Sequence, residues 1–533
     1  MADRLAEVGF QLSAAGIGLG AFSTTIDLLH ACKRGYDAWR GLRGLDQDLK
    51  VLRAKLVLQQ DLLDLWQRDW YGPEMGNGPT GMRLRLLEAH KDSVESVVAS
   101  VRSLLDQLTA LRAFAETGKT PEGMQRAKWI ANELQASRKA LAEIESLLEG
   151  LYRLLPPRSP NIYAAQLAIS LEDHDNNDDD SQAVEEALES SSSHTIVSGT
   201  LRLRNARRSL HDELQRRVNE MKNGPWPSEV VIPPHKVTER KIDDVSAGFR
   251  SFAKYNGIAA VIEWKKYDRS WQGLKRTQLM GRLDNLARLL MSEKKPNELN
   301  ILRCDGYFND PAGSRFGFVF TLPQPSTGYP SSLKELISNK SEANLPTLEQ
   351  RYFMAYSLGL SISILHATGW LHKSIRSHNV LFLREEDQSH SSRPAWSRPY
   401  LVGFDYSRPD GKDESSEKPE QSKRFDIYRH PLSQGSPNER YRKLFDYYSF
   451  GALLLEIGLW RSLWDLWREG TPPESFRREL EATAQVKVAH CMGRDYAEAA
   501  MKCLNGELQR RECSEQRVFF IEVVEVLGRY VAL

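Results

Sequence analysis

A histidine, a serine and an asparagine stand close together in the stretch "LHKSIRSHNVLF", which spans residues 371–382. A loop that catalyses phosphoryl transfer carries a carboxylate two residues after its histidine, to accept a proton, and an asparagine five residues further on, to bind a metal ion. His372 and Asn379 have these types and this spacing, but Ser374 occupies the carboxylate position. Because a serine hydroxyl cannot accept a proton at neutral pH as a carboxylate does, this stretch predicts impaired chemistry.

The other groups that phosphoryl transfer requires are replaced as well. A glycine-rich loop, G-x-G-x-x-G, should cover the phosphates, and none occurs in residues 226–260. The lysine that orients the phosphates ends the motif V-A-I-K, whereas "AVIE" places Glu263 there, and a carboxylate beside a triphosphate is repulsive. The helix expected over residues 271–291 has Asp284 as its only acid for an internal ion pair, and "GFD" places Gly403 where an aspartate should bind Mg²⁺.

Two neighbouring residues leave an alternative open. Lys265 lies on the same side of its strand as Glu263, one pleat repeat further along, and Asp405 follows Gly403 by two residues. Both would have to serve in place of the missing groups. Because the loop, the lysine, the glutamate, the base and the metal-binding aspartate are lost together, we predict no catalytic residue, no metal and no cofactor, and we do not expect ATP or Mg²⁺ to bind.

The order of six further motifs resembles a protein kinase over residues 226–533. These motifs are "FTLPQ", "LEQRYFMAYSLGLSISILHATGWLH", "PYLVGFDYSRP", "YRHP", "DYYSFGALLLEIGLW" and "YAEAAMKCLNGE". The resemblance implies a two-lobed α+β fold, with an N-lobe over about 226–322 and a C-lobe over about 323–533.

The retained residues of this domain hold the fold rather than the chemistry. The resemblance implies that Asp446 anchors the backbone of the loop and that His372 lies beneath it. Asn379, without its partners, is expected to be a hydrogen-bonding residue of the loop rather than a metal ligand. Together with the lost groups, these residues identify a pseudokinase, which is not an enzyme.

Composition excludes several other classes of function. The chain has 533 residues, of which 41% are hydrophobic and 27% charged, as expected for two to four globular domains. A net charge of +1 gives no field that favours nucleic acid. The five cysteines show no C-x-x-C spacing, so we expect a reducing, intracellular setting without a disulfide framework or zinc site. We find neither a secretory signal nor an apolar run of about 20 residues.

Residues 1–157 are predicted to form an all-α helical bundle. Four segments carry apolar residues at helical spacing, so that each presents one apolar face. The four stripes are Leu5, Val8, Leu12, Ala15, Leu19, Phe22, Ile26 and Leu29; Leu45, Leu49, Leu52, Leu56, Leu63, Trp66 and Trp70; Leu87, Val94, Val97, Val101, Leu104, Leu108 and Leu111; and Ile130, Leu134, Leu141, Ile144, Leu148 and Leu151.

Two connecting segments follow the bundle. Residues 158–198 are acidic, serine-rich and poor in aromatic residues, which predicts a flexible linker. Residues 199–225 are predicted to form a basic helix that either braces the next domain or binds lipid. The acids mixed among its basic residues favour the brace.

The first helix of the bundle has an unusual composition. Between Glu7 and Asp27 lie 19 residues without a charge, and their glycines each weaken a soluble helix by about 1 kcal/mol relative to alanine. One interpretation is that small residues permit tight packing in the bundle. The other is a conditional membrane segment, because Gly16 and Gly20 form a G-x-x-x-G pattern. The candidate membrane-facing residues are Leu12, Gly16, Leu19, Gly20 and Phe22.

This bundle resembles the HeLo domain, the prion-inhibition and propagation module of fungal heterokaryon-incompatibility proteins. The resemblance covers about residues 5–155 and rests on the uncharged first helix followed by "GLDQDLKVLRAKLVLQQDLLDLW". It implies a membrane-targeting domain that induces cell death once its N-terminal helix is released. The order of bundle, brace helix and pseudokinase also resembles the mixed-lineage kinase-like effectors of necroptosis.

The resemblances favour a cytoplasmic effector of programmed cell death that reaches the plasma membrane conditionally. The pseudokinase domain would sense an upstream protein, and the released bundle would form homo-oligomers and contact membrane lipids, with no role for nucleic acid. Two alternatives stay open. One is a scaffold or adaptor with a dimerising bundle, and the other is a divergent active protein kinase that uses Lys265 and Asp405.

Overall fold

The computed structural model divides the chain into two compact units, Met1–Ser198 and Gly199–Leu533, each with a hydrophobic core of its own. The residues that the structure describes are 23–40, 45, 47–71, 81–117, 126–155, 164–169, 183–184, 186–187, 195–220, 229–242, 248–268, 274–293, 295–323, 329–339, 345–386, 392–410, 422–435, 439–509 and 514–531. The membrane-facing candidates lie outside these described residues, so the membrane segment stays a prediction; they are Leu12, Gly16, Leu19, Gly20 and Phe22.

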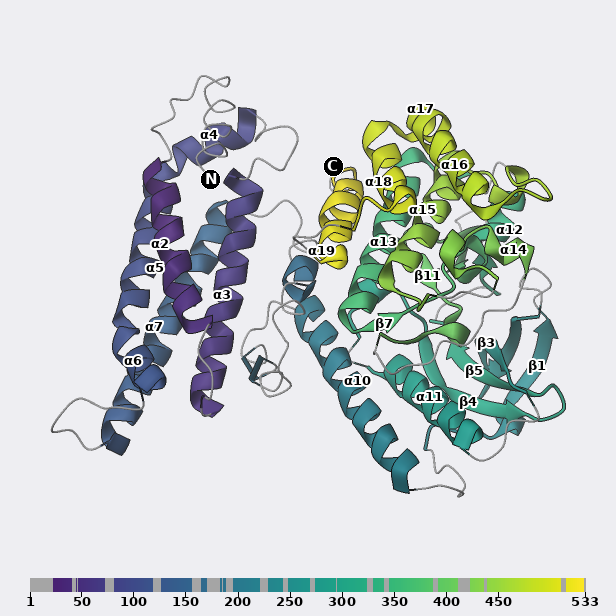
Figure 1. Ribbon diagram of the computed structural model, residues 1–533, viewed down its shortest axis with the longest axis horizontal. Helices are drawn as coiled ribbons and strands as arrows, with labels where there is room; N and C mark the ends of the chain where they lie inside the picture. Colours follow the sequence, from purple (N-terminus) through teal and green to yellow (C-terminus); the bar gives the residue numbers. More distant parts are fainter. Residues whose placement is uncertain are drawn as a thin grey trace. The chain divides into compact units, whose positions relative to one another are not determined.

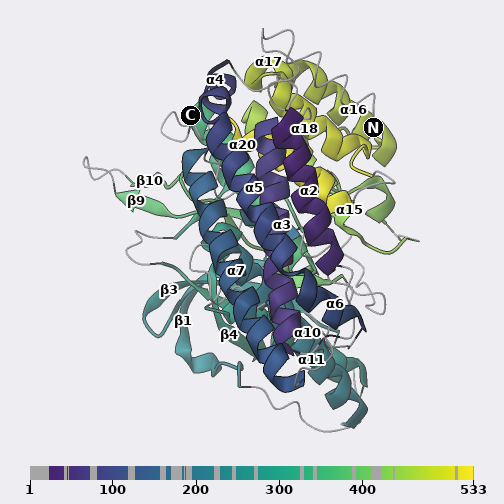
Figure 2. The same ribbon diagram turned by 90° about the vertical axis from the view of Figure 1, so that its left-hand side faces the viewer.

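Four long helices build the first unit. They are α2 (Ser23–Arg40), α3 (Gln47–Tyr71), α5 (Lys91–Gln107) and α7 (Arg126–Leu154), joined by the short helices α4 (Gly81–Ala89) and α6 (Thr109–Thr117). Helices α2 and α7 each pack against both α3 and α5, and Figure 2 shows the four running side by side. The predicted all-α character of the N-terminal part is therefore confirmed. None of the helices that the structure describes is both long and apolar enough to cross a bilayer.

Helices α3 and α7 run parallel. Asp48, at the beginning of α3, pairs with Arg138, near the middle of α7, at 2.5 Å. Near their ends, the indole N–H of Trp66 donates to the carbonyl oxygen of Leu155 at 3.1 Å. The first contact joins residues whose numbers differ by 90, and the second joins residues whose numbers differ by 89. Each residue of α3 therefore lies level with the residue of α7 whose number is higher by about 90.

The core of this unit contains the second, third and fourth apolar stripes that the sequence predicts, while most of the first stripe lies outside the described residues. All residues of the second stripe are buried, and so are those of the third and fourth stripes apart from the half-buried Val97 and Ile130. Val98 is fully buried in place of Val97, because a step of four residues from Val94 stays closer to one face of a helix with 3.6 residues per turn.

Part of the expected linker is ordered. Residues 164–169 are helical, and Leu167 and Ile169 are buried. Further on, Ala183 and Ala187 are buried too, and Glu186 accepts a hydrogen bond from Gln47 at 3.2 Å. These ordered parts differ from the flexible linker that the sequence predicts. The physical reason is that short apolar runs within an acidic segment can still bury their side chains.

The second unit contains a five-stranded antiparallel sheet. Its spatial order is β1-β2-β3-β5-β4, and its strands are β1 (Val237–Ile242), β2 (Arg250–Tyr255), β3 (Ile258–Lys266), β5 (Arg315–Thr321) and β4 (Arg303–Asp310). Strands β2 and β3 form a hairpin around Asn256 and Gly257, both with positive φ as a two-residue turn requires. Helix α11 (Leu274–Met291) packs against β4.

Helices dominate the rest of the second unit. They are α12 (Leu333–Ser338), α13 (Leu348–Ala367), α14 (Lys423–Asp426), α15 (Lys443–Leu459), α16 (Pro473–Thr483), α17 (Ala489–Met492), α18 (Arg494–Asn505), α19 (Glu515–Phe519) and α20 (Glu525–Gly528). Short strands lie between them: β6 (Ser331–Ser332), β7 (Trp370–Leu371), β8 (Val380–Phe382), β9 (Arg384–Glu386), β10 (Ser392–Pro394), β11 (Tyr400–Leu401) and β12 (Arg408–Pro409). Helix α15 is almost entirely buried and packs against α13 and α18.

Helix α10 (Thr195–Glu220) contains the segment expected to be a brace, and from Gly199 onward it belongs to the second unit. In Figure 1 it runs alongside α11, where the side-chain amide of Asn285 donates to the carbonyl oxygen of Leu210 at 3.1 Å. Arg207 donates through Nε to the carbonyl oxygen of Thr368 at 2.9 Å. At least one basic side chain of this helix therefore contacts protein.

Candidate functional site

Asp446 organises the loop between β7 and β8. This residue lies in the first turn of α15, and its carboxylate accepts hydrogen bonds from the backbone N–H groups of His372 and Lys373, both at 2.8 Å. The Tyr441 hydroxyl and the His366 ring contact the same carboxylate at 2.8 and 3.0 Å. Burial by itself would raise the pKa of Asp446, but the hydrogen bonds from His366 and Tyr441 outweigh it and hold the pKa below its ordinary value. The carboxylate is therefore charged, and it fixes the backbone of the loop.

His372 shapes the same loop from beneath. Its Nδ1 accepts a hydrogen bond from the backbone N–H of Ser374 at 3.2 Å, and its ring lies 4.8 Å from the ring of Phe404. Complete burial lowers the pKa of His372 to about 4, so the imidazole is neutral at pH 7. Its contacts are those of a residue that holds a turn.

The side chain of Asn379 is bonded at both ends of its amide. Its Nδ2 donates to the carbonyl oxygen and to the hydroxyl of Ser374, at 2.8 and 3.0 Å. Its Oδ1 accepts from Nη2 of Arg250 at 3.1 Å. A cation of the protein itself thus faces the oxygen that a metal ion would need.

Arg250 is the residue of this site that sequence reasoning missed. It comes from β2, is 2% exposed, and also donates through Nη1 to the carbonyl oxygen of His378 at 3.1 Å. Its partner across the hairpin is Glu263 on β3. The two-residue turn at Asn256 and Gly257 fixes this register, so the hairpin signal could have located Arg250 opposite Glu263.

Glu263 joins the sheet to the "GFD" segment. One carboxylate oxygen accepts from the backbone N–H of Gly403 at 2.5 Å, and the other from the backbone N–H of Phe404 at 3.0 Å. Burial raises the pKa of Glu263, while the charge of Arg250 opposes that rise. This glutamate therefore serves as an acceptor for backbone donors.

Gly403 leaves no space for a side chain. Its φ is +90°, in the left-handed region, and a Cβ atom added there would lie 2.2 Å from Nδ2 of Asn379. Any side chain at this position would have to displace Asn379. The glycine at position 403 and the bonding of Asn379 are thus sterically linked.

Lys265 and Asp405, the compensating pair of the divergent-kinase alternative, interact electrostatically. The Lys265 ammonium lies 4.4 Å from the ring centre of Tyr406. Burial raises the pKa of Asp405 to about 6, and the charges of Lys265 and Arg376 oppose that rise. Arg376 stacks 3.9 Å from the ring centre of Phe425, and burial lowers its pKa to about 10.

Helix α11 carries one buried acid. Asp284 is 2% exposed and accepts from Nε of Arg288, one turn further along the same helix, at 2.8 Å. The structure thus brings Glu263, Gly403 and Asn379 together, and it brings His372 and Asp446 together. One contact of Asp284 is made within α11. No group of three or more metal-ligating side chains lies together within the described ranges.

Comparison with known families gives one match. Residues 289–519 match the model of a family described as a domain of unknown function, DUF7580. The match includes Asn379, Gly403 and Asp446 but begins after Arg250 and Glu263. A search of curated proteins finds none that matches this chain.

Proposed function

We propose that this protein is a non-catalytic signalling effector in which a C-terminal pseudokinase domain controls an N-terminal bundle that acts on membranes, as in heterokaryon incompatibility or programmed cell death. The proposal rests on the buried contacts of Arg250 and Glu263. Each reaches from the sheet to the helical part of the second unit, Arg250 to Asn379 and Glu263 to the backbone at Gly403. Protein side chains thus make the connections that phosphates and metal ions make in a kinase.

Such a connection suits a switch more than a catalyst. Hydrogen bonds to charged groups contribute about 1.5–3 kcal/mol each, and a few of them are enough to hold one of two arrangements. An upstream protein that binds the pseudokinase domain would have to offset only that amount. The bundle has a core of its own between Leu29 and Leu155, so its release would not require unfolding. In this proposal, the released bundle forms homo-oligomers and contacts membrane lipids through its first helix.

Expression of residues 1–198, beside the full-length chain, tests the proposal. We expect the isolated unit to reduce cell viability and to sediment with membranes, and the full-length chain to do neither. Gly16→Glu, placed within the uncharged first helix, should abolish both effects, whereas Asp27→Glu at its charged end should keep them. A harmless isolated unit that stays in the supernatant would contradict the effector function.

The electrostatic interaction of Lys265 with Asp405 favours one second candidate, a divergent active kinase. A thermal-shift measurement with Mg·ATP separates the two. An effector without a nucleotide site should melt at the same temperature with and without Mg·ATP. A divergent kinase would be stabilised by Mg·ATP, and Lys265→Met would remove that stabilisation.

A further inference from the structure

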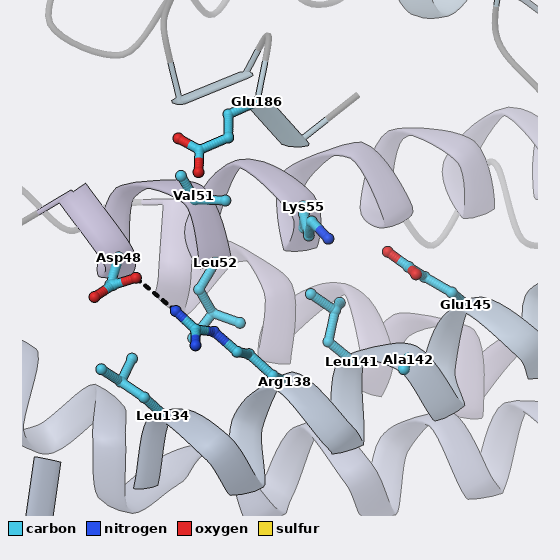
Figure 3. A pocket seen from close by; sticks show the side chains of 10 residues that line it. All are labelled: Asp48, Val51, Leu52, Lys55, Leu134, Arg138, Leu141, Ala142, Glu145 and Glu186. Atoms are coloured by element: carbon cyan, nitrogen blue, oxygen red, sulfur yellow. Dashed lines mark hydrogen bonds and ion pairs between the residues drawn. The ribbon is translucent and has the colours of Figure 1, made fainter. Parts of the chain in front are cut away.

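A pocket in the first unit lies between α3 and α7, away from the contacts described above. Its volume is about 490 Å³, within the range of small-molecule sites. Its apolar floor consists of Leu52, Leu134 and Leu141, all buried, with Val51 and Ala142 beside them. Charged side chains surround this floor (Figure 3).

Two pairs of opposite charges stand at the ends of this pocket. Because α3 and α7 run parallel, Asp48 lies level with Arg138, and Lys55, seven residues further on, lies level with Glu145. The order of signs is reversed between the helices: acid then base on α3, base then acid on α7. Each pair therefore consists of one acid and one base that face each other across the two helices, so the two pairs can be compared directly.

The first pair is closed and the second is open. Asp48 and Arg138 approach to 2.5 Å although both are exposed, with side-chain exposures of 60% and 66%. Lys55 and Glu145 are half-buried and point toward each other in Figure 3, yet neither makes a hydrogen bond or ion pair with any residue in the described ranges. Burial raises the pKa of Glu145, with the charge of Lys55 opposing it. Opposite charges attract more strongly when they are half-buried than when they are exposed. The half-buried pair, Lys55 and Glu145, is nevertheless the pair that makes no contact.

We propose that Lys55 and Glu145 bind the headgroup of a single zwitterionic phospholipid, with the phosphate on Lys55 and the ammonium on Glu145. Adjacent opposite charges on the ligand satisfy both residues at once. The apolar floor runs from Leu134 to Leu141, about 10 Å at 1.5 Å per residue, and lies beside the charged end. An extended apolar body joined to a zwitterion matches this order, and the start of an acyl chain has that form. This inference does not depend on the proposed effector function.

Calorimetric titration of the full-length protein with dihexanoyl phosphatidylethanolamine, below its critical micelle concentration, tests the site. We expect saturable binding of one lipid per chain, at least about tenfold tighter than binding of dihexanoyl phosphatidylglycerol, which lacks the ammonium. Glu145→Gln should remove that preference, and Lys55→Gln should weaken both lipids. The matched controls are Glu143→Gln and Lys139→Gln, exposed residues of α7 outside the pocket, and both should bind as the wild type does.

Several outcomes would overturn the assignment. Equal affinity of the wild type for the two lipids would contradict the assignment, and so would the absence of any binding to the wild type. The same loss in Glu143→Gln as in Glu145→Gln would place the effect outside the pocket. Displacement of the lipid by free leucine would assign the site to amino acids instead. The titration uses monomeric lipid, so a failure to bind it would not contradict the proposed action on membranes. Conversely, harmless expression of residues 1–198 would contradict the effector function but not lipid binding in the pocket.

Discussion

At the residue scale, one arginine links strand β2 to the residues just before β8. The guanidinium of Arg250 donates to the side-chain oxygen of Asn379 and to the carbonyl oxygen of His378. Its charge opposes the rise in the pKa of Glu263 that burial causes. A planar fork with several donors suits such a role better than a lysine would. The side-chain oxygen of Asn379 and the carbonyl oxygen of His378 therefore both have a donor from the protein itself.

Arg250→Met should destabilise the protein by about 3 kcal/mol, because it removes two charge-assisted hydrogen bonds and the positive charge that most opposes the effect of burial on Glu263. Chemical denaturation measures this loss. Arg303→Met is the matched control, since Arg303 lies in the same sheet with a side-chain exposure of 66%. Its loss should stay below about 1 kcal/mol. Similar losses in the two variants would contradict the buried role of Arg250.

Gly403→Ala should destabilise the protein more than Gly257→Ala. Both glycines have left-handed φ values, +90° and +81°, so each alanine incurs a backbone cost of about 1–2 kcal/mol. Only at Gly403 would the new Cβ collide with Asn379, since a Cβ at Gly257 meets nothing within 4 Å. We expect an additional loss of about 2 kcal/mol at Gly403 from this overpacking, measured by chemical denaturation. Equal losses would show that Asn379 can move without cost.

At the element scale, α10 connects two parts of the second unit. It meets α11 through Asn285 and the turn after α13 through Thr368. Helix α11 packs on the sheet, and the turn after α13 leads into the loop at His372. A shift of α10 would therefore act on the sheet and on the loop together.

Arg207→Ala should loosen α10. The variant loses a charge-assisted hydrogen bond to Thr368, so amides of α10 after Gly199 should exchange with solvent about tenfold faster. Hydrogen–deuterium exchange measures this change segment by segment. Asp212→Ala, which alters an exposed residue of the same helix, serves as the control and should leave the exchange unchanged. An unchanged rate in Arg207→Ala would exclude this anchor.

At the scale of the whole molecule, buried histidines make stability depend on pH. Burial lowers the pKa of His372 and of His430 from the ordinary value of 6.5 to about 4, and it also lowers the pKa of His378 well below 6.5. The unfolded chain therefore binds more protons than the folded chain below about pH 6.5, and stability falls as the pH falls from there toward 4. Asp405 acts in the opposite direction, because its pKa is raised to about 6.

His430→Gln should flatten this profile. Each such histidine contributes a loss of about 2 kcal/mol between pH 7 and pH 5, so the variant should lose about that much less than the wild type. Chemical denaturation at the two pH values gives the comparison. His235→Gln, at an exposed position, should keep the wild-type difference. A wild-type profile in His430→Gln would contradict a neutral, buried imidazole.

Features with a local physical origin were predictable from the sequence. Helical periodicity places Leu56, Trp66 and Ile144 in one core, because burial of a helix face follows directly from spacing. The residue types at Ser374 and Gly403 likewise predict the loss of a base and of a metal ligand, and this loss stays a prediction. The linker prediction rested on the acidic composition of the whole segment. It therefore did not take account of the short apolar run in which Leu167 and Ile169 are buried.

What only the tertiary structure decided are contacts between residues far apart in the sequence. Arg250 and Asn379 are separated by 129 positions, and Glu263 and Gly403 by 140. The pocket likewise depends on the parallel alignment of α3 and α7, which sets Lys55 opposite Glu145. Residue types limit which partners are chemically possible, but the choice among them depends on packing of the whole chain, which brings one donor within reach of one acceptor.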